Sequence, residues 1–319
     1  MFNTVRYYQL GILQSKFVIR VKTDNAGTSN NDQFTLPCSG SGYDFTATWD
    51  NGDTTTHTGS PGNITFTRPT TGEHTLTISG TFPTIRFNNG GDKSKLIEII
   101  NLGDVGWTSM DIAFFGCDNM DISPTCTGVL TGVSSYAGAW VGCTSMTSFP
   151  ALDLSGGTDF TSAWSGCSSM TSFNATALGS GSYSNAWLNC SSLISFPALD
   201  LSGGTSFAST WRDCSSLTSF PALDLSGGTN FESAWSDIGV LTSFATRNFF
   251  NMTNGGNCFL GTTLPTSDWS DILVTQRANN ANTGVSFHGG NSKYNPAGGV
   301  ARGELVTIQS WDITDGGAE

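Results

Sequence analysis

The chain has 319 residues, a formal net charge of -12, and only 12% charged residues. This composition argues against nucleic acid and anionic membrane surfaces as partners, because both need a basic patch and no Lys/Arg-rich stretch is present. Disorder is not expected either, since 21 Phe and 9 Trp supply large apolar side chains for a core.

The first 16 residues lack the basic, apolar and small-residue order of a secretory signal. We expect them to form an arm that docks on a neighbouring subunit. No segment reaches the roughly 18 apolar residues of a transmembrane helix, so no membrane insertion is expected. These features favour a virion component that is released by lysis, and a mature protein trimmed of its signal is the alternative. The apolar residues of the arm include Phe2, Tyr7, Tyr8, Leu10, Ile12 and Leu13.

Residues 17–94 alternate polar and apolar side chains between closely spaced turn signals. Many short strands in this arrangement predict an antiparallel β-sandwich. The expected strands cover residues 17–21, 34–36, 43–49, 63–67 and 74–79.

A turn motif within this region, Trp49-Asp-Asn-Gly-Asp53, is followed by His74-Thr-Leu-Thr-Ile-Ser-Gly80. The order resembles the polycystic-kidney-disease (PKD) type of immunoglobulin-like domain, which implies an immunoglobulin-like sandwich here. Asp50 and Asp53 could ligate a cation or cap the turn through Asx hydrogen bonds.

One pattern recurs five times between Tyr136 and Phe244. An aromatic residue is followed by Trp four positions later, then Cys (Ile238 in the last copy), then Met or Leu, then Phe. The leading aromatics are 24, 23, 24 and 24 residues apart, and a fixed period of this length is typical of a solenoid. We therefore predict a solenoid over residues 95–262, with a diverged first copy. The leading aromatics are Tyr136, Phe160, Tyr183, Phe207 and Phe231.

Within one repeat, Phe160, Trp164 and Cys167 fall at i, i+4 and i+7, which predicts a short helical turn. A short strand ending at Phe and a Gly-Gly turn complete the unit. Stacked units would pair their strands in parallel and bury the aromatic, Trp and Cys columns. The segment after Phe173 is one residue shorter than its counterparts, so a local irregularity is expected there.

Residues 263–319 are predicted to form a small α+β cap. Its expected elements are a helix with Thr266 or Ser267 as N-cap, a strand from Val285, a second helix over 296–307 and a last strand from Trp311. The predicted fold class is therefore mainly β with short helices: a β-sandwich over 17–94, a leucine-rich-repeat solenoid and this cap.

The repeat motif resembles that of the BspA-like group of bacterial leucine-rich-repeat surface proteins. The segments that carry the resemblance are Gly166-Cys-Ser-Ser-Met-Thr-Ser-Phe173 and Cys214-Ser-Ser-Leu-Thr-Ser-Phe-Pro-Ala-Leu-Asp224. Trp replaces the more usual Phe before Gly-Cys. The resemblance implies a cell-surface or virion-surface location and a role in adhesion. It transfers no catalytic residue.

Cysteines at 117, 143, 167, 190 and 214 share one column of the repeat, where the last copy has Ile238. A column that accepts Ile predicts buried thiols. The sequence has no C-x-x-C pair, so zinc binding is not expected. A local disulfide between Cys117 and Cys126 is left open.

The candidate ligand face consists of outward hydroxyls on the repeat strands and a broken acidic column. The hydroxyls suit a polar, glycan-like partner and equally suit a solvated sheet face. The carboxylates could cap turns or bind calcium, whereas the Trp column is assigned to the core and not to sugar stacking. No catalytic residue, cofactor or metal is predicted. The candidate residues are Ser148, Ser172, Ser195, Ser219, Ser243, Asp153, Asp200 and Asp224.

These observations lead us to expect a non-enzymatic bacteriophage virion surface protein, exposed on capsid or tail, for adhesion or host recognition. Expected partners are other virion proteins, through the arm or the sandwich, and a host surface glycan or protein. Assembly into a homo-oligomer is also compatible with these sequence features. The alternatives are an architectural capsid decoration protein, a bacterial cell-surface adhesin and a polysaccharide depolymerase.

Overall fold

The computed structural model describes residues 15–319, which divide into two compact units. The first ends at Gly157 and includes 174–177, and the second comprises 158–173 and 178–319. The protein is mainly β, as predicted, with 27% strand and 10% helix. The predicted arm lies, but for its last two residues, outside the described range. No helix within that range is long and apolar enough to cross a membrane.

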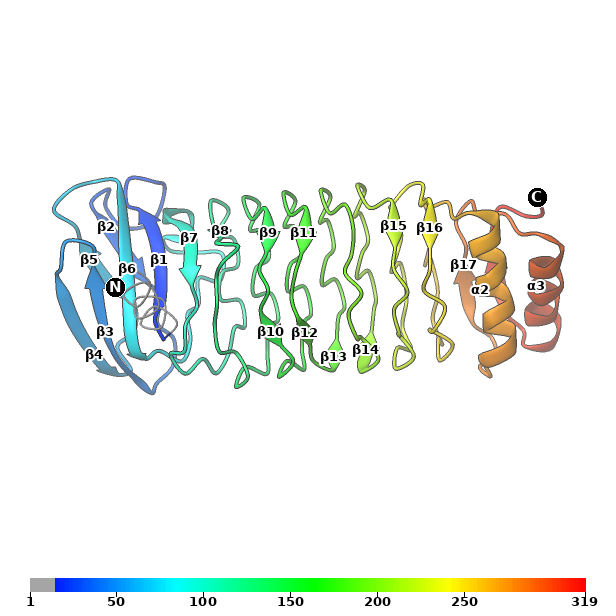
Figure 1. The fold of residues 1–319 in the computed structure, drawn as a ribbon, viewed down its shortest axis with the longest axis horizontal. Helices are drawn as coiled ribbons and strands as arrows, with labels where there is room; N and C mark the ends of the chain where they lie inside the picture. The colour runs from blue at the N-terminus through cyan, green and yellow to red at the C-terminus, as the bar shows by residue number, and fades with distance from the viewer. Residues whose placement is uncertain (1–14) are drawn as a thin grey trace, which may run out of the picture. The chain divides into compact units, whose positions relative to one another are not determined.

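The first unit contains a six-stranded sheet of order β4-β3-β6-β1-β7-β8 (Figure 1). Its strands pair antiparallel except β7 and β8, which are parallel. Two further strands, β2 (Gln33–Leu36) and β5 (Ile64–Thr67), form a separate antiparallel pair. The six strands are β1 (Phe17–Lys22), β3 (Tyr43–Trp49), β4 (Thr54–Gly59), β6 (Glu73–Thr81), β7 (Leu96–Asn101) and β8 (Asp121–Ile122).

Alternating side chains explain these strands. In β3 every second residue is buried, from Tyr43 to Trp49, which is the pattern of a strand with one face in the core. Trp49 meets Phe66 of β5 edge-on, with ring centroids 5.3 Å apart. All five expected strands are present. The sixth, β4, was missed because none of its residues is buried and its pattern is uniformly polar.

In the second unit, residues one repeat apart pair in parallel. β15 (Ser219–Phe220) and β16 (Ser243–Phe244) lie side by side in this way (Figure 1). The indole rings of Trp164, Trp187, Trp211 and Trp235 stack with successive centroid distances of 5.1, 5.9 and 5.4 Å, and all four are fully buried. The assignment of this column to the core is confirmed.

Six other short strands belong to the repeats. They are β9 (Ser148–Phe149), β10 (Asp153–Leu154), β11 (Ser172–Phe173), β12 (Ala177–Leu178), β13 (Gly181–Ser182) and β14 (Gly204–Ser206).

The helical turn predicted within each repeat is wrong. Two residues per repeat adopt left-handed backbone angles, such as Asn185 (φ 60°) and Asn189 (φ 62°), and such residues cannot continue a right-handed helix. Alternate N–H groups instead donate to the next repeat, for example from Trp187 to the carbonyl oxygen of Thr210 at 2.9 Å. The i, i+4, i+7 spacing correctly identified which side chains face the core. It did not identify the backbone conformation, because consecutive turns direct the same side chains to the core as a helix would.

The irregularity expected after Phe173 is confirmed. The pairing of β13 with β14 shifts register between Gly181 and Ser182. Gly181 has φ 146°, and a Cβ there would lie 1.8 Å from the carbonyl oxygen of Thr158. The shortened segment therefore depends on a glycine at this position.

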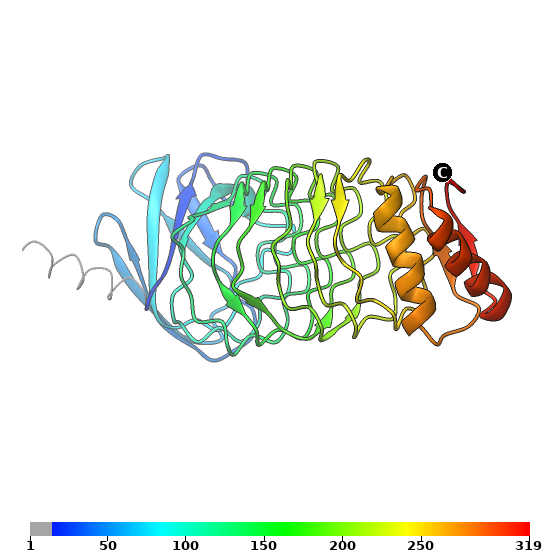
Figure 2. The ribbon, with the colours of Figure 1, turned by 45° about the vertical axis from the view of Figure 1, so that its right-hand side comes forward.

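The last residues form two helices that lie next to each other (Figure 2) and a two-stranded parallel pair. Neither Thr266 nor Ser267 is the N-cap of the first helix, because Pro265 holds that position and no side chain caps it. Gly298 lies in the second helix, where a Cβ would come within 2.9 Å of Ser270. Because glycine has no Cβ, the two helices can approach each other closely at this position. The elements are α2 (Thr266–Asn279), β17 (Ser286–His288), α3 (Pro296–Ile308) and β18 (Asp312–Thr314).

Candidate functional site

The structure brings three of the predicted serines into one column. Ser195 pairs with Ser219, and Ser219 pairs with Ser243, each in parallel register. Ser148 and Ser172 hold the same place at the start of β9 and β11. Ser195 and Ser243 are exposed and the other three are half-buried. Their hydroxyls therefore form part of the surface of the repeats.

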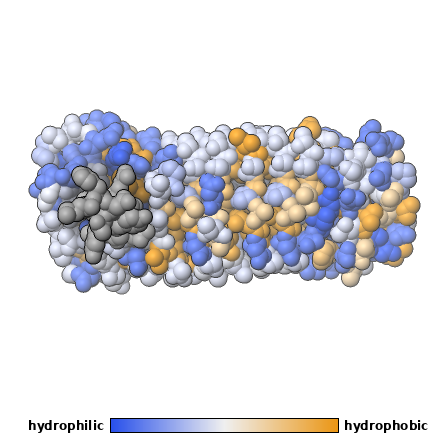
Figure 3. All heavy atoms as spheres, viewed as in Figure 1, coloured by the Kyte–Doolittle hydropathy of each residue, from blue (hydrophilic) through white to orange (hydrophobic). Residues whose placement is uncertain are grey.

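Methyl groups lie close to these hydroxyls along the chain. Thr242 donates both its N–H and its hydroxyl to the carbonyl oxygen of Thr218, at 2.8 and 2.9 Å, which fixes the side chain. Ile194 and Val240 are 55% and 70% exposed in the corresponding segments. Residues 168–173, 191–196, 215–220 and 239–244 include no charged side chain. In Figure 3 the surface over β15 is mostly pale, and a strongly hydrophilic patch begins beside β16, where the N–H of Phe244 donates to Asp268.

The acidic column caps turns. Asp153, Asp200 and Asp224 each accept a hydrogen bond from the backbone N–H two residues later, at 2.9, 3.0 and 3.0 Å. The hydrogen bonds from Ser155 hold the pKa of Asp153 below its ordinary value. Within residues 15–319 no three His, Cys, Asp or Glu side chains gather as a metal site would require. The capping interpretation of the column is thus the one that the geometry supports.

Sequence reasoning missed a second capping column. Asp159, Asn230 and Asn254 precede the leading aromatic position of their repeats, and each accepts a backbone N–H from two residues later, at 2.9, 3.1 and 3.0 Å. Asn230 and Asn254 also pair in parallel. Asp or Asn at the repeat spacing was the available signal, because these residues favour Asx turns.

All eight cysteines lie in the described range, where each is buried and none forms a disulfide, including Cys117 and Cys126. The thiol of Cys190 donates to the carbonyl oxygen of Trp164, and that of Cys214 to Trp187, both over 3.2 Å. Burial raises the pKa of Cys214 to about 12. Such thiols are structural donors and not nucleophiles, because the reactive thiolate is suppressed.

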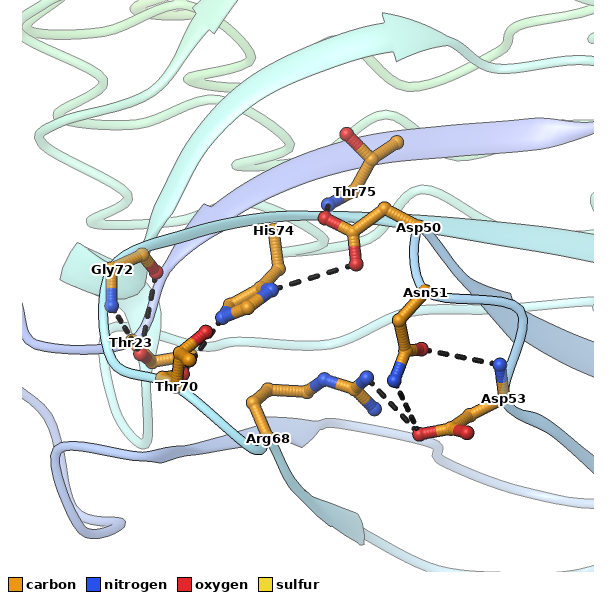
Figure 4. A network of polar contacts seen from close by, with 9 residues as sticks. All are labelled: Thr23, Asp50, Asn51, Asp53, Arg68, Thr70, Gly72, His74 and Thr75. Carbon is orange, nitrogen blue, oxygen red and sulfur yellow. Dashed lines mark hydrogen bonds and ion pairs between the residues drawn. The ribbon is translucent and has the colours of Figure 1, made fainter.

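The carboxylates of the Trp49–Asp53 turn are occupied by protein donors (Figure 4). Asp50 accepts from the N–H of Thr75 at 3.1 Å and lies 3.5 Å from His74. Asp53 accepts from the guanidinium of Arg68 at 3.3 Å. The interpretation of both residues as turn and loop anchors fits these contacts better than cation binding does.

A cavity of about 410 Å³, which is widely open to solvent, lies between β4 and β5. Arg68 is only 4% exposed, and its guanidinium carbon lies 4.5 Å from the ring centroid of Trp49. No sequence signal pointed to this site, because the pairing of strands brings distant residues together. The lining consists of Trp49, Asp53, Thr54, Thr55, Thr65, Phe66, Thr67 and Arg68.

Comparison of the chain with protein-family models, with curated proteins and with solved structures finds no match in any of the three. The resemblances to BspA-like repeats and to PKD domains therefore depend on the quoted motifs alone.

Proposed function

We propose that this protein is a non-enzymatic surface protein of a bacteriophage virion, exposed on capsid or tail, whose repeats adhere to a host or environmental surface. The observation that carries the proposal is the uncharged face built on the column of Ser195, Ser219 and Ser243 with its Thr neighbours. The resemblance of the repeat motif to BspA-like repeats supports a surface location.

The proposed architecture is a β-sandwich over 17–94, a leucine-rich-repeat solenoid over 95–262 and a cap over 263–319. Contacts between the six-stranded sheet and the β2–β5 pair support the sandwich, as where Trp49 packs on Phe66. The stacked Trp rings and the parallel pairs of Ser219 with Ser243 support the solenoid. A solenoid presents an extended surface and so suits binding.

The chemistry of the face suits an uncharged, repeating glycan. Hydroxyls recur about 4.8 Å apart from repeat to repeat, the spacing of paired strands, and can donate to or accept from sugar hydroxyls. The exposed methyl groups of Ile194 and Val240 can pack on the apolar faces of sugar rings. Weak contacts repeated along one rigid surface add up through multivalency, so no single deep pocket is needed.

Immunogold labelling of assembled phage particles with an antibody against this chain tests the proposed location. We expect gold on the outside of intact capsids or tails. Gold confined to the bacterial envelope would replace the proposal with the cell-surface adhesin. Labelled particles whose adsorption is unchanged after removal of residues 95–262 would instead indicate a purely architectural decoration protein.

A further inference from the structure

Within residues 15–319, the strand β4 is a sheet edge that no other strand covers. It ends the six-stranded sheet, and among the described strands it pairs only with β3. Five of its six residues are exposed. Proteins usually protect such edges with Lys, Pro or a bulge, and the segment Thr54–Gly59 has none of these. An edge of this kind is a template for an added strand.

The backbone direction along β4 follows from one hydrogen bond. The N–H of Trp49 donates to the carbonyl oxygen of Asp53 at 2.9 Å. Because alternate residues of an antiparallel strand direct their N–H and C=O groups to opposite sides, Thr55 and His57 bond to β3. The backbone groups that point away from the sheet belong to Thr54, Thr56 and Thr58.

The cavity between β4 and β5 lies beside this edge. His57 of β4 faces inward, where its ring meets that of Phe66 at 6.0 Å. A strand added to β4 would direct alternate side chains to the same inner side. There only small parts of Trp49, Phe66 and Arg68 reach the open pocket, and their mixed apolar and polar character suits a tyrosine, which combines an apolar ring with a polar tip.

We propose that the β4 edge and this cavity, together called the β4 dock, receive residues 2–13 of a second copy of the chain as an added strand. That segment contains Tyr7 and Tyr8, and its only charged residue is Arg6. Asp44, whose register partner in β4 is Thr58, is exposed beside the dock and carries the opposite charge.

A second copy is the occupant because of the strand order. The segment leads into β1, and β6 and β3 lie between β1 and β4. The chain's own segment would have to cross both strands, whereas that of a neighbour approaches the open edge directly. This inference concerns assembly of the protein and does not depend on glycan binding by the repeats.

A matched pair of variants tests the dock. Thr56→Pro removes one outward N–H and leaves the β3–β4 hydrogen bonds intact, whereas Thr56→Ala removes the same hydroxyl and keeps the N–H. We expect the native full-length chain and Thr56→Ala to self-associate in sedimentation equilibrium. Thr56→Pro should associate about tenfold more weakly, with an unchanged far-UV circular dichroism spectrum. A synthetic peptide of residues 1–16 should dissociate the native complex.

Equal association of the two variants would overturn the proposal, as would a native chain that remains monomeric. A Tyr7→Ala, Tyr8→Ala peptide that competes as well as the native peptide would exclude the cavity from the dock. A chain without residues 1–14 provides the last check. If the native chain is monomeric and this deletion uncovers peptide binding, the occupant is the chain's own segment and the second-copy proposal fails.

Discussion

The thiol sulfur of Cys214 lies 3.2 Å from the carbonyl oxygen of Trp187, one repeat earlier in the chain. Thr262 occupies the same column after Ile238, and its hydroxyl donates to the carbonyl oxygen of Trp235 at 2.6 Å. Except at Ile238, which has no side-chain donor, these positions of the column link repeats through side-chain donors to backbone acceptors. This role explains why Thr can replace Cys, which small size and hydrophobicity alone would not.

Replacing Cys214 tests this role. We expect Cys214→Thr to lower the free energy of unfolding by less than about 1 kcal/mol, because a donor to Trp187 is kept. Cys214→Ala should cost about 1–2 kcal/mol more, since it removes the donor and leaves a small void. Urea unfolding measures both. An alanine variant as stable as the threonine variant would show that the hydrogen bond contributes nothing.

The Trp column should tolerate Phe but not Ala. The indole nitrogen of the buried Trp187 has no acceptor within the described part of the chain, so Trp187→Phe sacrifices no hydrogen bond. Phe259 already stacks on Trp235 in the equivalent place, with centroids 5.2 Å apart. We expect a loss of about 1–2 kcal/mol for Trp187→Phe and about 3–5 kcal/mol for Trp187→Ala in the same urea assay. Equal losses would point to a hidden polar role for the indole.

The backbone at Asn189 is left-handed, so the stability of a variant at this position should depend on how readily the new residue adopts a positive φ. Gly166 holds the equivalent place with φ 75°. Asn189→Gly should therefore change the melting temperature little, whereas Asn189→Val should destabilise by at least about 1–2 kcal/mol, because a β-branched residue resists positive φ. Differential scanning calorimetry compares the two. A valine variant that melts with the glycine variant would contradict the assigned conformation.

Acid should destabilise the first unit through the buried Asp92. Burial alone would raise its pKa, but hydrogen bonds from Ser29 and Thr35 and the nearby Lys95 hold the pKa below its ordinary value. A lowered folded-state pKa means that the stabilisation is present above the unfolded value, about 3.9, and is lost as pH falls through the folded value.

The measurement for Asp92 is urea unfolding between pH 7 and pH 2. Asp92→Asn should be less stable than the native chain at pH 7, and the difference should narrow in acid. A difference that stays constant across this range would mean that ionisation of Asp92 does not contribute.

The spacing of Trp, Cys and Phe predicted the repeat and its buried columns, because side chains that fill a core must recur with the backbone period. The same spacing did not determine the backbone path. Asn185 and Asn189 adopt left-handed angles that the i, i+4, i+7 pattern cannot distinguish from a helical turn. The Asn and Asp residues at the repeat period were the informative signal.

The candidate site was predictable to a different extent. The outward serines and the capping by Asp153 follow from local rules of facing and of Asx turns. The β4 dock was not predictable, because the segment Thr54–Gly59 buries nothing and becomes a strand only by pairing with β3. The adjoining cavity depends on Arg68 and Trp49, which are brought together by tertiary packing.

The most direct test of the adhesive function is binding of the purified full-length chain to a panel of immobilised bacterial capsular and lipopolysaccharide glycans. The test variant carries Ser195→Glu, Ser219→Glu and Ser243→Glu. The matched control carries Thr205→Glu, Thr229→Glu and Thr253→Glu, which place the same added charge on exposed positions outside the proposed face.

We predict that the native chain binds at least one uncharged glycan in a saturable manner. The affinity should fall at least about tenfold in the serine variant and should be unchanged in the threonine variant. Absence of binding by the native chain to every glycan, or equal loss in both variants, would contradict recognition through the serine column.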